Sequence, residues 1–277
     1  MLWKTFTSVG FAHEKYVIRM QKTVSYVQSL KHAHEKITML TAYDYPTAQI
    51  LNEAGIDIIL VGDTLGMVVM GYADTRSVTM AHMLHHTRIV ARGNTECLLV
   101  SDLPHQSYET PEQAVANAHL LREAGAHAVK LEGNYTEIVK AIVNAGMPVM
   151  GHVGLLPQTS ERFRVRGRQI AEAEQIVADA HALENAGCFA IVLESIPDAL
   201  GTKITQELSI PTIGIGAGPG CDGQVLVIHD LLGLFDRFTP TFVKRYADLR
   251  KEIHRAVTRY KLEVQQGKFP DAAHSYH

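Results

Sequence analysis

Acidic and histidine side chains recur along this chain directly after short apolar runs, in positions from which they could act together. Uninterrupted apolar runs of this kind are typical of parallel strands that are buried on both faces. The residues that follow the runs are, in order, Asp44, Asp63, Asp102, Glu132, His152, Glu194, a glycine-rich segment at 214–218, and His229 with Asp230. If one sheet carries all the strands, these side chains gather on one rim. Taken singly, each acid could instead cap a helix or fix a turn.

Carboxylates on one rim repel one another, so the cluster needs a cation, a shared proton or a basic partner. We expect a divalent cation. Oxygen ligands without thiols favour Mg²⁺ over zinc, and Mg²⁺ usually takes only one or two protein carboxylates. Lys130 stands two residues before Glu132, so the two side chains share one face of the strand. Lys130 could therefore hold an anionic substrate, or it could pair with a neighbouring acid.

Glu194 is the candidate general base, because it follows a wholly apolar run at 190–193. Partial burial there would raise its pKa, although a simple ion pair is the alternative. His152 could orient a substrate oxygen or satisfy a backbone carbonyl. A glycine-rich segment at this place binds phosphate in other barrels, but here it could instead permit the close approach of a bulky cofactor.

The elements that must position these residues are marked by a repeated signal. Four helical stretches end in Ala-Gly, at 54–55, 124–125, 145–146 and 186–187, and an apolar run follows each one. The predicted strands are 37–42, 58–61, 97–101, 128–131, 148–151, 190–193, 212–215 and 225–228. Eight strands with polar residues at their ends favour an α/β fold, a closed (β/α)8 TIM barrel, over an open doubly wound sheet.

We expect one barrel domain over residues 20–277, preceded by a poorly ordered extension at 1–19. Apolar residues at helical spacing predict a last, charged helix over 242–265, which would pack outside the barrel or against a neighbouring subunit. This segment is the predicted C-terminal helical extension.

Composition excludes several classes of protein. The 26 basic and 29 acidic residues are mixed and give a formal charge of −3, so no basic stripe is available for nucleic acid. Three scattered cysteines, Cys97, Cys188 and Cys221, do not make a disulfide framework. No apolar run approaches the roughly 18 residues that span a bilayer, so we expect a cytoplasmic protein without membrane partners.

Ordered motifs along the chain resemble the ketopantoate hydroxymethyltransferase family, within the superfamily of barrels that includes phosphoenolpyruvate mutase and isocitrate lyase. The resemblance runs from about Thr41 to the C-terminus. Its segments include Thr41-Ala42-Tyr43-Asp44-Tyr45, Val61-Gly62-Asp63-Thr64-Leu65-Gly66-Met67, Asp102-Leu103-Pro104, Lys130-Leu131-Glu132-Gly133, Gly151-His152-Val153-Gly154-Leu155, Leu193-Glu194-Ser195-Ile196-Pro197 and Val227-Ile228-His229-Asp230.

The resemblance implies transfer of a hydroxymethyl group from 5,10-methylenetetrahydrofolate to 3-methyl-2-oxobutanoate, giving 2-dehydropantoate for pantothenate and coenzyme A synthesis. It implies that Asp63 and Asp102 bind Mg²⁺, with support from Glu132, and that these two aspartates also contact the substrate. It further implies substrate binding by Thr64, Lys130 and His152, catalysis by Glu194 as the base, and assembly as a homodecamer.

Two segments depart from the family pattern. Threonine stands at position 64 where the family usually has serine, and the stretch 157–168 is shorter and keeps only part of the family's motif. We therefore keep two alternatives: a metal-dependent lyase or mutase of the same superfamily that acts on a 2-oxo acid without folate, and a catalytically silent barrel that serves as a binding module. The altered stretch could change a lid over the site, or it could be an ordinary exposed loop.

Overall fold

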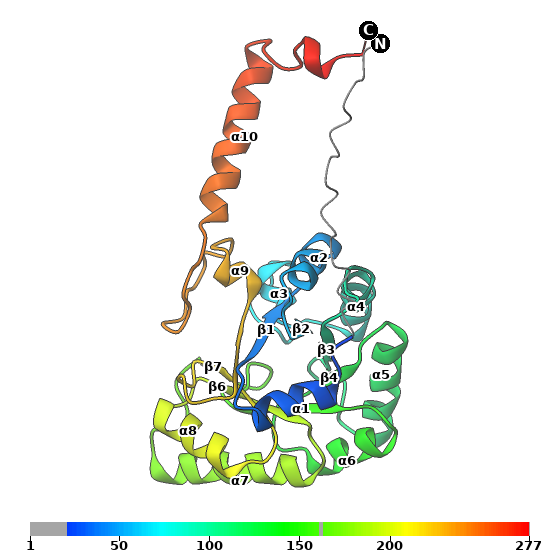
Figure 1. The fold of residues 1–277 in the computed structure, drawn as a ribbon, viewed down its shortest axis with the longest axis vertical. Coiled ribbons are helices and arrows are strands. Elements are labelled where there is room, and N and C mark those ends of the chain that lie inside the picture. The colour runs from blue at the N-terminus through cyan, green and yellow to red at the C-terminus, as the bar shows by residue number, and fades with distance from the viewer. Residues whose placement is uncertain (1–20, 161–162, 277) are drawn as a thin grey trace, which may run out of the picture.

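Eight parallel strands form a closed barrel in the computed structural model, which describes residues 21–160 and 163–276. The strands are β1 (Ile37–Thr41), β2 (Ile58–Val61), β3 (Leu98–Asp102), β4 (Ala128–Lys130), β5 (Val149–Gly154), β6 (Ala190–Glu194), β7 (Thr212–Ile215) and β8 (Gly223–Leu226). Each pairs with the next in sequence, and β8 pairs with β1 to close the ring (Figure 1). The predicted barrel is confirmed, and the open sheet is excluded.

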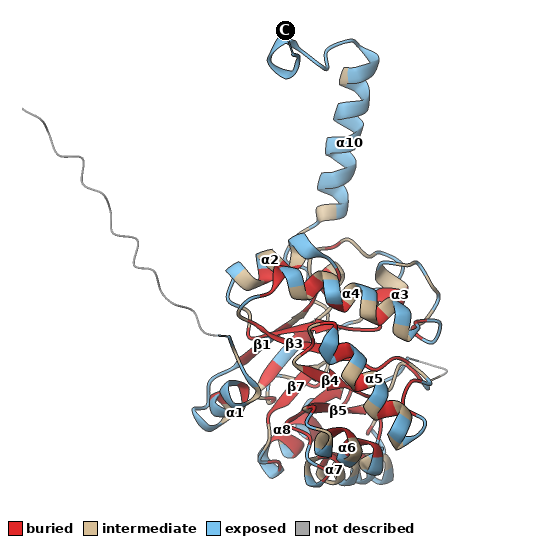
Figure 2. Ribbon diagram, turned by 90° about the vertical axis from the view of Figure 1, so that its right-hand side faces the viewer, coloured by how far each residue is buried: buried red, intermediate tan, exposed pale blue. Residues whose placement is uncertain are grey.

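Helices surround the barrel on its outside (Figures 1 and 2). They are α2 (Tyr45–Glu53), α3 (Leu65–Val68), α4 (Met80–Gly93), α5 (Pro111–Glu123), α6 (Thr136–Asn144), α7 (Ile170–Asn185), α8 (Asp198–Glu207) and α9 (Ile228–Leu231). Several begin with a hydroxyl cap, such as Thr110, whose side chain accepts the backbone N–H of Gln113 at the start of α5. The helices hold the strand ends in fixed positions.

The core has two parts because side chains alternate along each strand. In β2, Ile58 and Leu60 join a cluster to which strands from all around the ring contribute, so this cluster fills the barrel. Ile59 and Val61 join the cluster between the strands and the helices. Helix α1 (Val24–His32) adds Val27 to the inner cluster beside the first residues of the strands, and so closes the amino end. The carboxyl end is left for the site.

The last helix, α10 (Leu249–Gln265), is shorter than predicted, because residues 242–248 are mostly irregular rather than helical. It has no buried residue and extends away from the barrel (Figure 2). Backbone hydrogen bonds from Tyr246 to Leu231 (2.8 Å) and from Leu249 to Leu232 (2.9 Å) join its base to α9. A 3₁₀ turn, η1 (Ala272–His274), follows it.

The predicted extension at residues 1–19 lies outside the described residues, and the domain boundary at residue 20 stays a prediction. Among residues 21–160 and 163–276, every helix is too short or too polar to cross a membrane.

Candidate functional site at the barrel mouth

The predicted site residues meet at the carboxyl end of the barrel. Asp102 and Glu194 are the last residues of β3 and β6, and His152 lies within β5 rather than after it, because this strand continues to Gly154. Glu132 follows β4 by two residues. By the alternation of side chains these residues point into the barrel. Asp63, Asp102, Lys130, Glu132 and His152 are all at most 5% exposed, which is rare for charged side chains without partners.

Asp102 connects the ends of three neighbouring strands. Its Oδ2 accepts the backbone N–H of Asp63 at 3.0 Å, and its Oδ1 accepts the Lys130 Nζ at 2.8 Å. Burial alone would lower the pKa of Lys130, but the charges of Asp102, Glu132 and Asp63 outweigh this effect and raise it. Lys130 is therefore a fixed cation. It pairs with a neighbouring acid, as one of the two sequence interpretations expected.

Of the three buried acids, Asp63 has the fewest partners that stabilise a negative charge. Its Oδ2 accepts a hydrogen bond from the Gln158 Nε2 at 2.8 Å. Burial raises the pKa of Asp63 well above its ordinary value, and the negative charges of Asp102 and Glu132 raise it further. A cation at this position would favour the ionised form.

His152 lies between two acids. Its Nδ1 is 3.6 Å from the Glu132 Oε1 and its Nε2 is 3.3 Å from the Glu194 Oε2, and neither nitrogen completes a hydrogen bond among the described residues. Burial alone would lower the pKa of His152, but the two carboxylates outweigh it and raise the pKa to about 9. His152 thus contacts acids, not a backbone carbonyl, and carries a positive charge near neutral pH.

Gln158 completes the cluster and was not predicted. It is 1% exposed, donates its Nε2 to Asp63 and to the Leu103 carbonyl (3.0 Å), and donates its backbone N–H to the Glu132 Oε2 at 2.9 Å. Its Oε1 accepts the hydroxyl of Tyr108. In the sequence Gln158 belongs to a polar loop, and nothing in its neighbours signals that the loop turns inward.

The arrangement of the acids suits a hard divalent cation that needs few protein ligands. In the described part of the chain no three His, Cys, Asp or Glu side chains form a group arranged to hold a metal. Asp63 and Asp102 nevertheless stand side by side, and one or two carboxylates are what Mg²⁺ commonly takes from a protein. Three buried acids, Asp63, Asp102 and Glu132, face two buried cations, so an added positive charge would balance the cluster.

An open cavity of about 330 Å³ lies over the mouth. Thr64 and Glu194 contribute to its wall, and the Thr64 hydroxyl does not cap α3, although Thr64 is the residue before that helix. Apolar and aromatic side chains make most of the remaining wall. One of them, Phe242, packs on Gly216, where an added Cβ would come within 2.6 Å of its ring. The glycine-rich segment therefore admits an aromatic ring of the chain itself, and the approach of a cofactor to it stays a prediction.

Some rim residues have simpler roles. Asp44 is exposed and its side chain accepts the Thr47 N–H at 2.8 Å, so it caps α2. The His229 ring stacks at 5.6 Å from that of Tyr43, and its Nδ1 is buried. Burial lowers the pKa of His229. Neither Asp44 nor His229 lines the cavity.

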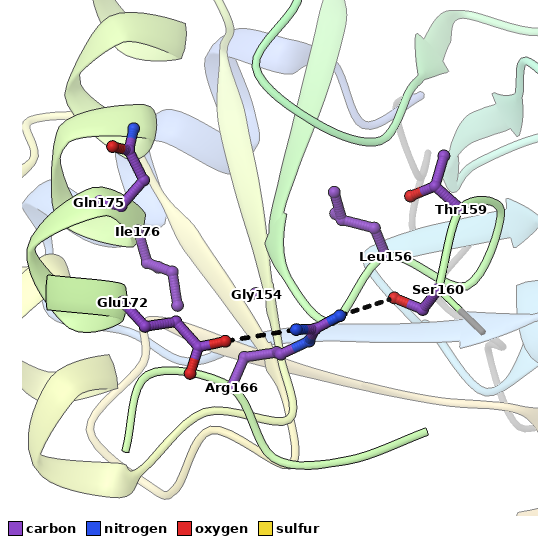
Figure 3. A pocket seen from close by; sticks show the side chains of 8 residues that line it. All are labelled: Gly154, Leu156, Thr159, Ser160, Arg166, Glu172, Gln175 and Ile176. Atoms are coloured by element: carbon purple, nitrogen blue, oxygen red, sulfur yellow. Dashed lines mark hydrogen bonds and ion pairs between the residues drawn. The ribbon is translucent and has the colours of Figure 1, made fainter. Parts of the chain in front are cut away.

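The altered loop is attached to the start of α7. Arg166 lies between Glu172 and Ser160, with nitrogen to oxygen distances of 3.3 Å to each (Figure 3), and the backbone N–H of Gly167 donates to Glu172 at 2.8 Å. Phe163, Arg164 and Val165 of this loop line the cavity over the mouth. Residues 163–165 therefore form part of the cavity wall, and a lid over the site stays a prediction.

Comparison with known sequences gives long matches. A family model described as ketopantoate hydroxymethyltransferase matches residues 21–272. A 3-methyl-2-oxobutanoate hydroxymethyltransferase of Moorella thermoacetica is 56% identical over 265 residues, which cover 93% of this chain and 98% of the relative. The enzyme of the same name from Syntrophus aciditrophicus is 53% identical over 261 residues, covering 92% and 96%.

Comparison with solved structures shows the same fold at low identity. A phosphonopyruvate hydrolase in complex with oxalate and Mg²⁺ aligns with a TM-score of 0.63 at 14% identity, covering 93% of this chain and 92% of that one. A 2,3-dimethylmalate lyase of the PEP mutase/isocitrate lyase superfamily aligns with a TM-score of 0.61 at 16% identity, covering 91% of each chain.

Removing the Gln158 side chain should weaken the fold. In Gln158→Ala the buried carboxylate of Asp63 and the carbonyl of Leu103 lose their donor, so we expect the free energy of unfolding to fall by about 1–3 kcal/mol. Urea titration followed by circular dichroism measures this. The exposed Gln175, whose side chain donates a hydrogen bond to Asp179, provides the matched control, and Gln175→Ala should change stability by less than about 0.5 kcal/mol. Equal effects of the two changes would contradict the structural role of Gln158.

Proposed function

This chain belongs to the ketopantoate hydroxymethyltransferase family, and we propose that the mouth of its barrel carries out the family's reaction. The chain is a 3-methyl-2-oxobutanoate hydroxymethyltransferase of pantothenate biosynthesis. Membership of the family implies methylenetetrahydrofolate as its co-substrate. The observation that supports this site is the meeting of Asp63, Asp102, Lys130, Glu132 and Glu194 around one opening, where Lys130 supplies the charge that an anionic 2-oxo acid needs.

Mg²⁺ fits Asp63 and Asp102, with Glu132 supporting it directly or through water, and when bound it would polarise the keto oxygen of the substrate. Lys130 binds the negative end of the 2-oxo acid by charge. The hydroxyl of Thr64 donates to a substrate oxygen from the cavity wall. Asp63 and Asp102 also face the substrate, and His152 is the positive charge beside it.

Glu194 acts as the base. Water breaks the two carbon–nitrogen bonds of methylenetetrahydrofolate, so that tetrahydrofolate leaves with both protons and the one-carbon unit remains at the formaldehyde level. Glu194 takes the proton from the substrate carbon next to the keto group, that carbon bonds to the one-carbon unit, and Glu194 returns the proton to the new hydroxyl oxygen. His152, 3.3 Å from the Glu194 Oε2, orients this carboxylate toward the opening. A positioned base contributes about 10²–10⁴-fold to such a proton transfer, so binding and polarisation of the substrate must supply the rest.

A lyase or mutase activity without folate has weaker support. The solved lyases and hydrolases that share this fold are only 14% and 16% identical to the chain, whereas the hydroxymethyltransferase of Moorella thermoacetica is 56% identical. Fold alone does not carry a reaction from one barrel to another. We also propose a cytoplasmic location, because the three cysteines are buried and unpaired, as in a reducing compartment.

A direct assay tests the function. The purified protein with 3-methyl-2-oxobutanoate, methylenetetrahydrofolate and Mg²⁺ should form 2-dehydropantoate, and a chelator should reduce the rate by at least about 100-fold, because the keto oxygen loses its polarising charge. Chromatographic detection of the product measures the rate. Restoration of the rate by excess Mg²⁺ is the control. Product formation at an unchanged rate in the chelator would remove the metal from the proposal.

Substitution of the base separates proton transfer from metal binding. Glu194→Gln keeps the shape of the side chain but cannot accept the proton, so deuterium exchange at the substrate carbon should slow by about 10²–10⁴-fold. Mg²⁺ affinity, measured by calorimetry, should change little. Glu207→Gln on the exposed surface of α8 is the control and should exchange at the wild-type rate. Exchange at the wild-type rate in Glu194→Gln would show that another group takes the proton.

We further propose that the protein is a homo-oligomer, a homodecamer by resemblance, and that α10 forms part of its contacts. Ile253, Val257, Tyr260 and Val264 fall on one side of this helix and all are exposed in the single chain. A stripe of this kind is typical of a surface that packs against another chain.

Charges placed on this stripe should therefore break the assembly. For the double variant Ile253→Glu and Val257→Glu we expect a smaller mass by light scattering, with an unchanged circular dichroism spectrum, because the barrel core does not involve α10. Arg255→Glu, on the opposite side of the helix, is the control and should keep the wild-type mass. A double variant of wild-type mass would exclude this helix from the contacts.

A further inference from the structure

We propose that Asp230 and the aromatic residues near it form the subsite for the pterin ring of the folate co-substrate, and that the Asp230 carboxylate accepts the N–H donors at the edge of that ring. This inference rests on the proposed function and adds to it the place and the recognition of the co-substrate. The mechanism above leaves Asp230 without a role, although it follows the last strand at the same rim.

The cavity over the mouth is lined both by residues beside the acid cluster and by the aromatic residues near Asp230. Glu194 and Thr64 line it on the side of the acid cluster, and Phe235, Phe238 and Phe242 belong to the same wall as Asp230. A flat ring system bound between such side chains gains apolar contact and stacking with its faces. Because Glu194 borders the same space, a one-carbon unit attached to this ring would lie close to the carbon that Glu194 deprotonates.

The Asp230 carboxylate can accept hydrogen bonds from a ligand. No side chain or backbone group in the described part of the chain donates a hydrogen bond to its carboxylate or forms an ion pair with it. Its basic neighbour, Arg245, donates instead to the Thr239 hydroxyl at 2.7 Å. Burial raises the pKa of Asp230 to about 6, and Arg245 opposes the shift only in part. A carboxylate that is half buried without donors is unfavourable, so a ligand that brings donors is stabilised there.

The chemistry of the two substrates decides which of them Asp230 binds. A pterin carries a ring N–H and an amino group side by side, and a carboxylate can accept both in a paired geometry, as it does from arginine. The 2-oxo acid has no such donors, and its own negative charge would be repelled by Asp230. Arg164 lies on the same cavity wall, is more than half exposed and is 3.4 Å from the Glu172 carboxylate, so its charge at the rim would be shared between that acid and the anionic tail of a folate.

The test compares Asp230→Asn with wild type. The amide presents one acceptor and one donor to a ring edge that carries two donors, so the Kd for tetrahydrofolate and the KM for methylenetetrahydrofolate should each rise by about 10- to 100-fold. The KM for 3-methyl-2-oxobutanoate and the rate of its deuterium exchange without folate should not change. Asp236→Asn, at an exposed site paired with Arg250, is the control and should bind tetrahydrofolate as wild type does.

A second measurement needs no variant. A tetrahydrofolate analogue whose 2-amino group is replaced by methyl should bind the wild-type protein at least about 10-fold more weakly than tetrahydrofolate, because Asp230 loses one donor. Equal binding of the analogue, or wild-type affinity in Asp230→Asn, would overturn the assignment of Asp230. The proposed function would fail in a different way, through a wild-type protein that binds tetrahydrofolate but forms no 2-dehydropantoate.

Discussion

The structure depends on the balance of charge in the buried cluster at the carboxyl end of the barrel. Asp63, Asp102 and Glu132 are each at most 3% exposed, and such acids are tolerated in a protein interior only when positive charge and hydrogen-bond donors surround them. Lys130 and His152 supply two positive charges, and the backbone of Asp63 and the side chain of Gln158 supply donors. The remaining negative charge fits the Mg²⁺ proposed above, and a bound cation would in turn attract an anionic substrate.

The apolar residues that fill the barrel and the charged residues proposed for the reaction lie in different parts of it. Its inner apolar cluster is closed at the amino end by α1, while the charged residues occupy the opposite end, where the strands stop and the loops begin. Asp102, His152 and Glu194 lie on the strands themselves, in β3, β5 and β6. The loops add residues that can differ among related barrels without loss of the core.

Much of this arrangement could be predicted from the sequence because two simple periodicities determine it. Continuous apolar runs separated by Ala-Gly helix ends predict the strands, and alternation along each strand places Lys130 and Glu132 on one face. What could not be predicted depends on tertiary contacts. Gln158 reaches the cluster only because its loop folds inward, and Asp44, which has the same sequence context as Asp63, caps a helix instead. The start of α10 was predicted too early, since apolar spacing continues through the irregular segment at 242–248.

The contact between Phe242 and Gly216 joins the site to the segment that leads out of the barrel. The same segment is bonded through Tyr246 and Leu249 to α9, which carries Asp230, and it continues directly into the protruding helix. One continuous stretch of chain therefore runs from Phe242 in the cavity wall to the base of α10, and the acids at the ends of β3 and β6 are not part of it.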